Sequence, residues 1–282
     1  MKTNQDKLVM FSLQGKIHHP THSTAFRVGY DGKGRILPST GGITYNFQIG
    51  DCCMGIVGDH IEPGVSIKNS DNRENEALNL FSCIGNEAKV ISGDAKGRTG
   101  IVTGTHGGVD HVFLYFDQET LELLNVNDTI AIKGYGTGLA IEAYPTIKIM
   151  NLDPSLLKKL ALKEVGRQLH VGVSHIIPAY LMGSGIGVAE IHSGDYDIMT
   201  QDKETITELG LDQLRFGDLV AIRDHCAHNG PHYKKGSTVI GAIVHSDSYS
   251  SGHGPGVAVI MSCEDDALVP FLQADANLKT YF

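Results

Sequence analysis

The sequence predicts a β-rich α+β protein made of two related β-barrel or sandwich-like domains with few short helices. Helical periodicity is scarce, and most apolar segments are short and rich in Val, Ile, Tyr and Phe. Gly, Asn or Asp separates these segments, as expected for strands joined by tight turns. The chain contains 34 glycines among 282 residues, which fits many such turns. An internal echo, described below, suggests that one scaffold occurs twice.

The strands are expected at the short β-branched and aromatic segments. They are residues 8–13, 42–49, 88–91, 101–104, 111–116, 129–133, 146–150, 170–177, 218–223, 237–245 and 256–263. The clearest helix is expected at 155–165, because Asp153 and Pro154 provide a favourable start. Short helices are expected at 119–124 and 204–214.

Two stretches share a pattern of short helix, Asp-bearing turn and strand. Residues 120–133 read TLELLNVNDTIAIK, and residues 210–223 read GLDQLRFGDLVAIR. In each, leucines three residues apart would seat the helix on a sheet. Upstream, HGGVDHV at 106–112 is similar to HSGDYDI at 192–198.

These echoes predict two related modules, at about 100–135 and 186–225. The predicted domains are residues 1–148, which include a hairpin described below, and residues 149–282. Chance similarity between short β segments is the alternative explanation.

Composition and charge disfavour several classes of protein. A net charge of −9 argues against a general nucleic-acid binder, which needs a basic surface. No apolar segment is long enough to span a bilayer and no signal-peptide pattern is present, so a cytoplasmic protein is expected. Five cysteines without a CxxC pair indicate reduced thiols. A homo-oligomer is the default expectation for such a chain.

Three ionisable residues gather in the segment GDHIEPG (58–64). In an extended backbone His60 and Glu62 would share one face, with Asp59 on the other. An imidazole and a carboxylate together suit a divalent metal such as zinc or manganese. A metal-free His–carboxylate pair for proton transfer is one alternative, and a polar turn ending at Pro63 and Gly64 is the other.

The segment GTHGGVDH (104–111) places two histidines across a Gly-Gly turn, so their side chains can converge. His106 is expected to be a ligand or polar contact, and His111 a structural residue. The predicted catalytic residues are therefore Asp59, His60, Glu62 and His106. Of these, His60, Glu62 and His106 would bind the metal or position a water, and Asp59 would orient a histidine or act as a general base.

Two further loops carry secondary candidates. The segment DHCAHNGPH (224–232) holds His225 and His228, and the segment VHSDSYSSGHGPGV (244–257) holds His245, Asp247 and His253. Loops on a shared scaffold commonly carry function. A mobile surface loop for the first segment, and a long hairpin loop for the second, are the alternatives.

Several stretches together resemble a known family. They are LPSTGGITYNFQIGD (37–51), GDHIEPGVSI (58–67), ALNLFSCIGNEAKVISGDAKGRTGIVTGTHGG (77–108), LRFGDLVAI (214–222) and VHSD…GHGPGV (244–257). The sequence resembles an uncharacterised bacterial and archaeal family, a domain of unknown function with N-terminal and C-terminal halves. This resemblance covers nearly the whole chain and implies a two-domain architecture, without catalytic residues to carry over.

The segment KVISGDAKGRTGIVTG (89–104) is similar to the KOW hairpin of ribosomal proteins and transcription elongation factors. In those proteins basic residues of the hairpin face RNA. Here only Lys96 and Arg98 would serve, and the acidic chain with few aromatic residues makes nucleic acid an unfavoured partner.

The leading hypothesis is therefore a small-molecule enzyme of hydrolase or lyase type, with a His/carboxylate site and a divalent metal. A non-catalytic small-molecule-binding or assembly protein is the alternative, because no known catalytic signature occurs. RNA binding through the hairpin comes third.

Overall fold

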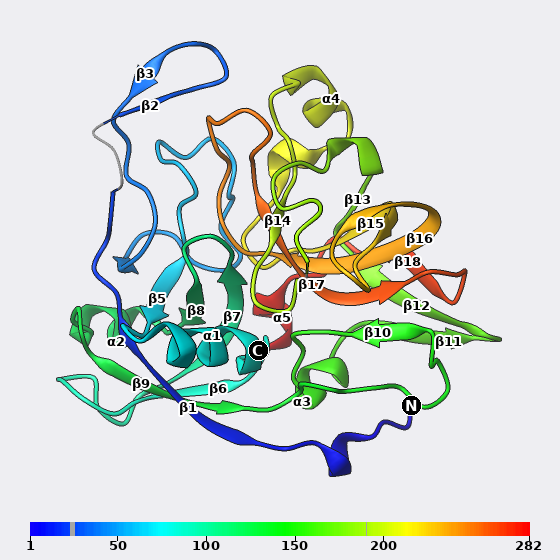
Figure 1. Ribbon diagram of the computed structural model, residues 1–282, viewed down its shortest axis with the longest axis horizontal. Coiled ribbons are helices and arrows are strands. Elements are labelled where there is room, and N and C mark those ends of the chain that lie inside the picture. The colour runs from blue at the N-terminus through cyan, green and yellow to red at the C-terminus, as the bar shows by residue number, and fades with distance from the viewer. Residues whose placement is uncertain (23–25, 190) are drawn as a thin grey trace.

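The computed structural model describes residues 1–22, 26–189 and 191–282, and Figure 1 shows its elements in chain order. Strands hold 37% of the residues and helices 14%, which confirms the predicted β-rich class with few helices. The first half of the chain contains one closed barrel, whereas the strands of the second half form open sheets. The expectation of a barrel or sandwich in each half is therefore corrected for the second half.

Six strands of the first half close into the barrel. In order they are β1 (Phe11–Ile17), β9 (Thr129–Gly134), β6 (Glu87–Val90), β7 (Thr99–His106), β8 (His111–Tyr115) and β5 (Gly64–Lys68), and β5 pairs again with β1. The short strand β4 (Ile43–Thr44) continues the sheet beside β5. Buried aliphatic side chains such as Val65, Val102 and Ile130 form the core. Burial alternates along β6 and β9, whereas consecutive residues are buried along β5 and β8.

The second half is built on a larger open sheet and a smaller one. The larger sheet has the order β10 (Ile147–Ile149), β17 (Gly256–Cys263), β16 (His232–Ile243), β15 (Leu219–Cys226) and β13 (His175–Ile177), with β14 (Tyr196–Asp197) also paired to β17. The smaller sheet contains β11 (Leu162–Val165), β12 (Gln168–Val173) and β18 (Leu268–Leu272). A separate hairpin is formed by β2 (Arg27–Val28) and β3 (Gly34–Arg35).

The helices are short. They are α1 (Asn72–Phe81), α2 (Gln118–Leu123), α3 (Pro154–Leu157), α4 (Lys203–Glu208) and α5 (Leu278–Tyr281), with 3₁₀ turns η1 (Gln5–Lys7), η2 (Ala179–Leu181) and η3 (Leu211–Gln213). In α1, the side chain of Asp71 caps the N-terminus by accepting from the amides of Arg73 and Glu74. Among the described residues, no helix is long and apolar enough to cross a membrane.

Two helix predictions were too long. The predicted helix 155–165 ends after α3, and residues 162–165 become the edge strand β11, paired with β12. Pairing and burial of Leu162 against the small sheet therefore override the local helical pattern. The predicted helix 204–214 is divided into α4 and η3 at Gly210, which has a φ of 69°. Glycine adopts this left-handed conformation without the penalty that a Cβ brings.

The echoed segments share a local structure. Asp128 accepts a hydrogen bond from the amide of Asn125 at 2.8 Å, and Asp218 accepts one from the amide of Arg215 at 2.9 Å. The strands that follow have different neighbours, because β9 lies between β1 and β6, whereas β15 lies between β16 and β13. The two segments are therefore alike in the helix–turn–strand unit itself and differ in the strands beside it. Glu190, in the second predicted module, lies outside the described residues, and the domain boundary at 148/149 stays a prediction.

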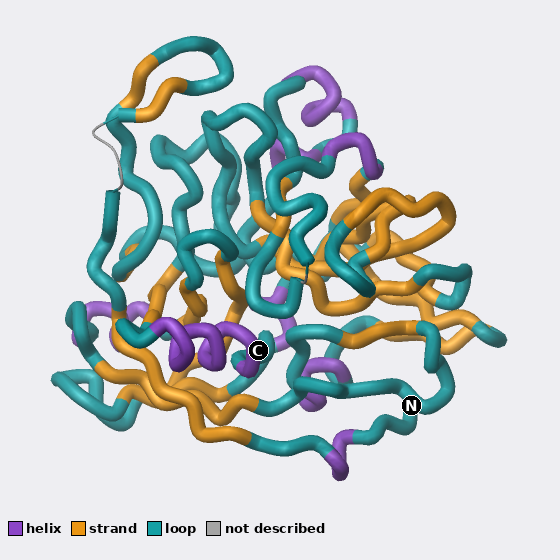
Figure 2. The backbone as a smooth tube through the Cα atoms, in the orientation of Figure 1, coloured by secondary structure: helices purple, strands orange, loops and turns teal. Residues whose placement is uncertain are grey.

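The barrel and the larger sheet pack directly against each other. A Cβ at Gly104 of β7 would overlap the side chain of Val244, so glycine permits the close approach of β7 to the end of β16. The loop at 45–62 also contacts the second half of the chain. There the amide of Ser246 donates to the carbonyl of Ile61, and the amide of Ile61 donates to the hydroxyl of Ser246. Figures 1 and 2 show the long loops gathered above the ends of β7 and β8, beside β14.

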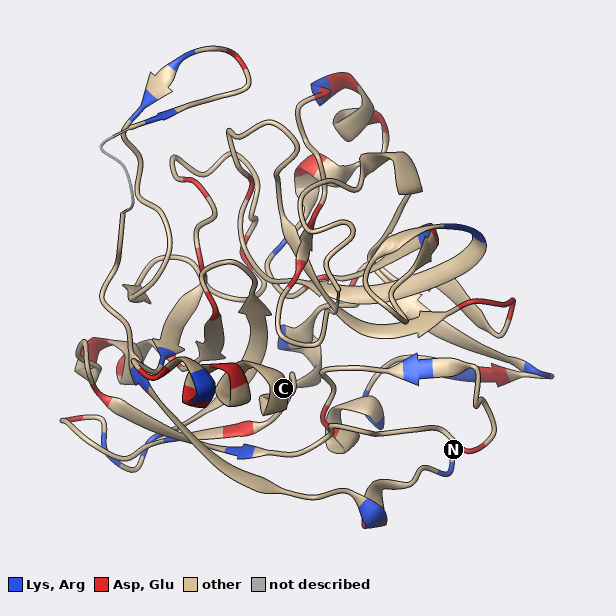
Figure 3. Cartoon of the chain, viewed as in Figure 1, with Lys and Arg blue, Asp and Glu red and all other residues tan. Residues whose placement is uncertain are grey.

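Charge is distributed unevenly around this junction. Figure 3 shows Asp and Glu along the central loops, whereas Lys and Arg are spread over outer parts of the chain, including the β2–β3 hairpin, α1 and β10. In the KOW-like segment, β6 and β7 do form an antiparallel pair, with Lys89 opposite Thr99. Arg98 makes an ion pair with Glu119, and RNA binding by this hairpin stays a prediction.

A candidate metal centre of histidine and aspartate

Histidines and carboxylates from four parts of the chain meet where the barrel faces the larger sheet. The loop before β5 supplies His60 and Glu62, and the β7–β8 hairpin supplies His106 and His111. The segment at β14 supplies Asp195 and Asp197, and the loop between β16 and β17 supplies His245 and His253. Most of these side chains are buried, and ring centroids of His106 and His245 lie only 4.3 Å apart.

Glu62 is the buried anchor of the barrel side. Its carboxylate accepts from His106 Nδ1 at 2.6 Å, His111 Nδ1 at 2.9 Å, the amide of Gly41 at 2.7 Å and Ser66 Oγ at 2.5 Å. Burial opposes ionisation, but the hydrogen bonds from His106 and His111 outweigh it and lower the pKa of Glu62. Because a carboxylate can only accept, both histidines carry hydrogen on Nδ1, and Nε2 of His106 is left as a lone-pair donor.

The first group consists of His106, Asp195 and His245. His245 is fully buried, and its Nδ1 donates to the carbonyl of Ser246 at 3.0 Å, so Nε2 is the free nitrogen. This Nε2 lies 2.8 Å from Asp195 Oδ2. The other carboxylate oxygen, Oδ1, accepts from the amide of Gly107 at 2.7 Å. His106 and His245 are thus each fixed through Nδ1, and Asp195 through one oxygen.

The facing atoms of this group form a buried ion pair only when His245 is protonated. His245 Nε2 lies 2.8 Å from Asp195 Oδ2 and 3.5 Å from Asp197 Oδ1, and both His245 Nε2 and Asp195 Oδ2 are buried from solvent. A Cβ at Gly256, the first residue of β17, would overlap both atoms. Nearby Asp195 and Asp197 raise the pKa of His245 although burial lowers it. In a metal-free site, this imidazole would therefore have to be protonated.

The second group consists of His60, Asp197 and His253. His253 Nδ1 lies 2.9 Å from Asp197 Oδ2, and His60 Nε2 lies 3.1 Å from His253 Nδ1 and 3.6 Å from Asp197 Oδ2. The Nδ1 of His60 faces Asp59 Oδ2 at 3.3 Å. Burial opposes ionisation of Asp197, but hydrogen bonds from His245, His253 and His60 lower its pKa.

Asp59 is held by the loop that carries His245. Its Oδ1 accepts from Ser248 Oγ at 2.7 Å and from the amide of Tyr249 at 3.2 Å, and Arg27 approaches Oδ2 at 3.3 Å. The hydrogen bond and charge of His60 lower the pKa of Asp59 against the opposing effect of burial. Asp59 thereby orients His60.

This arrangement can hold divalent transition metals. In each group the ligand-forming atoms all lie within 4.8 Å of one another. Metal-binding histidines in proteins normally donate their other ring N–H to a carboxylate or a carbonyl, as His106 does to Glu62 and His245 to Ser246. Imidazole with carboxylate suits zinc and also manganese.

Two family models together match almost the whole chain. The N-terminal model of a domain of unknown function, DUF4438, matches residues 26–158, and its C-terminal model matches residues 159–282. The chain belongs to the DUF4438 family. The resemblance drawn from the sequence motifs is confirmed.

A solved DUF4438-like structure, "Crystal structure of TM1086", is similar to this chain along its length. The two are 45% identical, and the match covers 100% of this chain and 99% of that chain with a TM-score of 0.96. No curated protein matches.

The structure separates His60 and Glu62, which the sequence placed on one face. His60 has a φ of 54°, in the left-handed region, so the extended alternation assumed for this segment is broken. As a result His60 faces Asp197 and His253, whereas Glu62 faces His106 and His111. Both oxygens of Glu62 accept hydrogen bonds, and among the described residues Glu62 is in none of the groups of side chains that could hold a metal ion, so its role as a metal ligand stays a prediction.

The secondary candidates are divided between the site and its surroundings. His245 and His253 belong to the two groups. Asp247 contacts Thr200 and, at 3.4 Å, Lys203. His225 is buried in a stack on Tyr196, with ring centroids 5.7 Å apart, and burial lowers its pKa to about 4.

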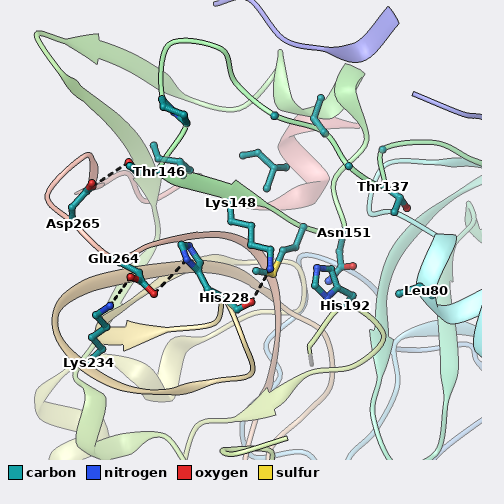
Figure 4. Close-up of a pocket in the computed structure, with 18 residues that line it drawn as sticks. Leu80, Thr137, Thr146, Lys148, Asn151, His192, His228, Lys234, Glu264 and Asp265 are labelled. Atoms are coloured by element: carbon teal, nitrogen blue, oxygen red, sulfur yellow. Dashed lines mark hydrogen bonds and ion pairs between the residues drawn. The ribbon is translucent and has the colours of Figure 1, made fainter. Parts of the chain in front are cut away.

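His228 belongs to a third cluster, with Cys226 and Glu264. It borders a cavity of about 770 Å³ between β10 and the β16–β17 region, shown in Figure 4. Lys234 holds Glu264 at 2.6 Å, and Lys148 donates to the carbonyl of His228 at 2.7 Å. The cavity shares no lining residue with the first two groups. Because Lys234 competes for its carboxylate, this cluster is the weaker metal candidate.

Asp195 and Asp197 were missed by the sequence analysis. They lie in HSGDYDI (192–198), which was noted only for its similarity to HGGVDHV (106–112). The signal was the alternation Asp-Tyr-Asp, which places both carboxylates on one side of an extended segment and Tyr196 on the other. Tyr196 is fully buried in the core of the larger sheet.

Proposed function

We propose that the chain is a divalent-metal-dependent enzyme that hydrolyses a small polar molecule, with zinc or manganese bound by His106, Asp195 and His245. The observation that carries this proposal is the pair His245 Nε2 and Asp195 Oδ2. Both atoms are buried and face each other at 2.8 Å, so without a metal they need a proton between them. A shared cation would take the place of that proton.

The surrounding residues prepare this group for a cation. Glu62 holds the proton of His106 on Nδ1, and the carbonyl of Ser246 does the same for His245. The amide of Gly107 fixes the second oxygen of Asp195. Two histidines and a carboxylate held in place in this way form a ligand set common in catalytic zinc sites, which keep a further position for water or substrate.

The chemistry proposed is the addition of water across a scissile bond. When bound, the metal ion would polarise the substrate and lower the pKa of water. The oxygen of water forms a bond to the electrophilic atom of the substrate, and the proton goes to the leaving group as its bond breaks. His253 has a side chain that is 36% exposed, whereas His245 is fully covered, so access is from the His253 side.

A metal-binding protein without turnover is the second candidate. The complete burial of His245 favours it, because structural metal sites are closed to solvent. A lyase would use the same residues, and only product analysis distinguishes it from a hydrolase.

Metal analysis combined with matched variants tests the proposal. Purified protein and Asp195→Asn are stripped with chelator and titrated with Zn²⁺ or Mn²⁺ alone by calorimetry. His19→Gln serves as the control, because it changes an exposed histidine that lies outside all three groups. We expect wild type and control to bind, and Asp195→Asn to lose at least tenfold in affinity.

Turnover is then measured on panels of phosphate esters, carboxylate esters, amides and lactones. Metal-dependent hydrolysis that is lost in Asp195→Asn supports the enzyme. Tight binding with no turnover supports the non-catalytic alternative, and unchanged binding in Asp195→Asn contradicts the site.

A further inference from the structure

We propose that the centre is dinuclear, with Asp197 as a carboxylate bridge between one ion at His106, Asp195 and His245 and a second ion at His60 and His253. This inference rests on the proposed function and adds a second metal position to it. It follows from the direction of the two oxygens of Asp197, from the spacing of the second group and from the way His60 is held.

The two oxygens of Asp197 face different groups. Oδ1 lies 3.5 Å from His245 Nε2, which belongs to the first group. Oδ2 lies 2.9 Å from His253 Nδ1 and 3.6 Å from His60 Nε2, which belong to the second. A carboxylate that points one oxygen at each of two ligand sets is the usual bridge in two-metal sites, where the ions lie about 3.5–4 Å apart.

The second group has the spacing of a metal coordination sphere. Ligand atoms that lie about 2.0–2.1 Å from a tetrahedral zinc ion are separated from one another by roughly 3.3 Å. In this group the three separations are 2.9, 3.1 and 3.6 Å. Two imidazole nitrogens and a carboxylate oxygen therefore already form a triangle of the required size.

His60 is held in place by its backbone as well as by Asp59. Its φ of 54° is uncommon outside glycine, and the residue is only 7% exposed. The strain persists because Asp59 fixes Nδ1, and Ser248 and Tyr249 fix Asp59 in turn. These contacts aim Nε2 of His60 at Asp197 and His253.

The two positions differ in access. The first group is closed, with side chains of His245 and Asp195 exposed by 0% and 4%. The second includes His253, exposed by 36%. We infer that the inner ion is exchanged slowly and that the outer ion meets solvent and substrate.

Metal stoichiometry tests the inference directly. Chelator-treated protein is loaded with Mn²⁺, the free metal is removed, and bound metal is counted by mass spectrometry. We expect two ions per chain in wild type and in the control His19→Gln, and one in His253→Gln. Asp195→Asn should lose the inner ion, and Asp197→Ala should weaken both by at least tenfold.

Electron paramagnetic resonance supplies an independent readout. Two Mn²⁺ ions joined by one carboxylate are magnetically coupled, so the signal of the loaded wild type should be broadened and weaker per ion than that of His253→Gln. Folding of every variant is checked by circular dichroism and thermal unfolding.

The possible results separate the two proposals. One ion per chain in wild type, retained in His253→Gln, overturns the dinuclear centre and leaves the proposed metal site intact. Absence of any bound ion overturns both. Two ions that are both retained in Asp197→Ala, with an unchanged signal, overturn the bridge.

Discussion

The substitution Glu62→Gln is the sharpest perturbation of the site, because it changes one atom and leaves the shape. The carboxylate of Glu62 accepts from His106 Nδ1, His111 Nδ1, the amide of Gly41 and Ser66 Oγ. A glutamine has only one accepting oxygen and would present an NH₂ group to another donor. With the oxygen kept near Gly41 and Ser66, the NH₂ faces His106.

His106 would then have to accept at Nδ1 and carry its proton on Nε2, the nitrogen assigned to the metal. Loss of such an orienting partner lowers metal affinity about 10–100-fold, which corresponds to about 1.4–2.8 kcal/mol. We expect Glu62→Gln to raise the Kd for Zn²⁺ by this factor, measured by competition with a chromophoric chelator at constant pH.

The matched control is Glu87→Gln, which removes a carboxylate that pairs with Lys133 on the barrel surface and lies outside all three groups. Its Kd should equal that of wild type. A Kd for Glu62→Gln within twofold of wild type, with the fold intact, would refute the positioning role of Glu62.

The other predictions concern backbone space, acid stability and helix capping. Gly256→Ala should lose metal binding and about 1–3 kcal/mol of stability by thermal unfolding, since its Cβ overlaps Asp195 and His245; a normal metal content would contradict this. Burial holds the pKa of His225 at about 4, below its usual 6.5, so the unfolded chain binds more protons between these values and stability falls as pH drops through this window. His225→Phe keeps the aromatic stack on Tyr196 and removes the titrating group. In denaturant titrations, the loss of unfolding free energy below the usual pKa should become smaller by about 1.4 kcal/mol per pH unit, and a pH profile equal to that of wild type would contradict this role of His225. Asp71→Ala should lower the free energy of unfolding by about 1 kcal/mol, with no change in metal affinity.

Local features of the site could be predicted from the sequence. His60 was a candidate because three ionisable residues gather in its segment, His106 because it lies at a Gly-Gly turn, and His245 and His253 as secondary candidates in one loop. The predicted helix at 119–124 matches α2 within a residue. In such segments the local pattern and the final fold favour the same structure.

Features that depend on distant contacts could not be predicted. The left-handed backbone of His60 reverses the expected face and depends on contacts to the loop at Ser248. The approach of Asp195 to His245 depends on pairing of β14 with β17, which sequence spacing does not encode. The helix expected at 155–165 gave way to β11 because the partner strand β12 lies next to it.

The most direct test of the account is an anomalous-difference map from crystals of protein loaded with Zn²⁺, collected above and below the zinc absorption edge. The account predicts an anomalous peak within bonding distance of His106 Nε2, His245 Nε2 and Asp195 Oδ2, and a second peak beside His60 and His253. A map from fully loaded crystals with no peak between His245 and Asp195 would contradict it.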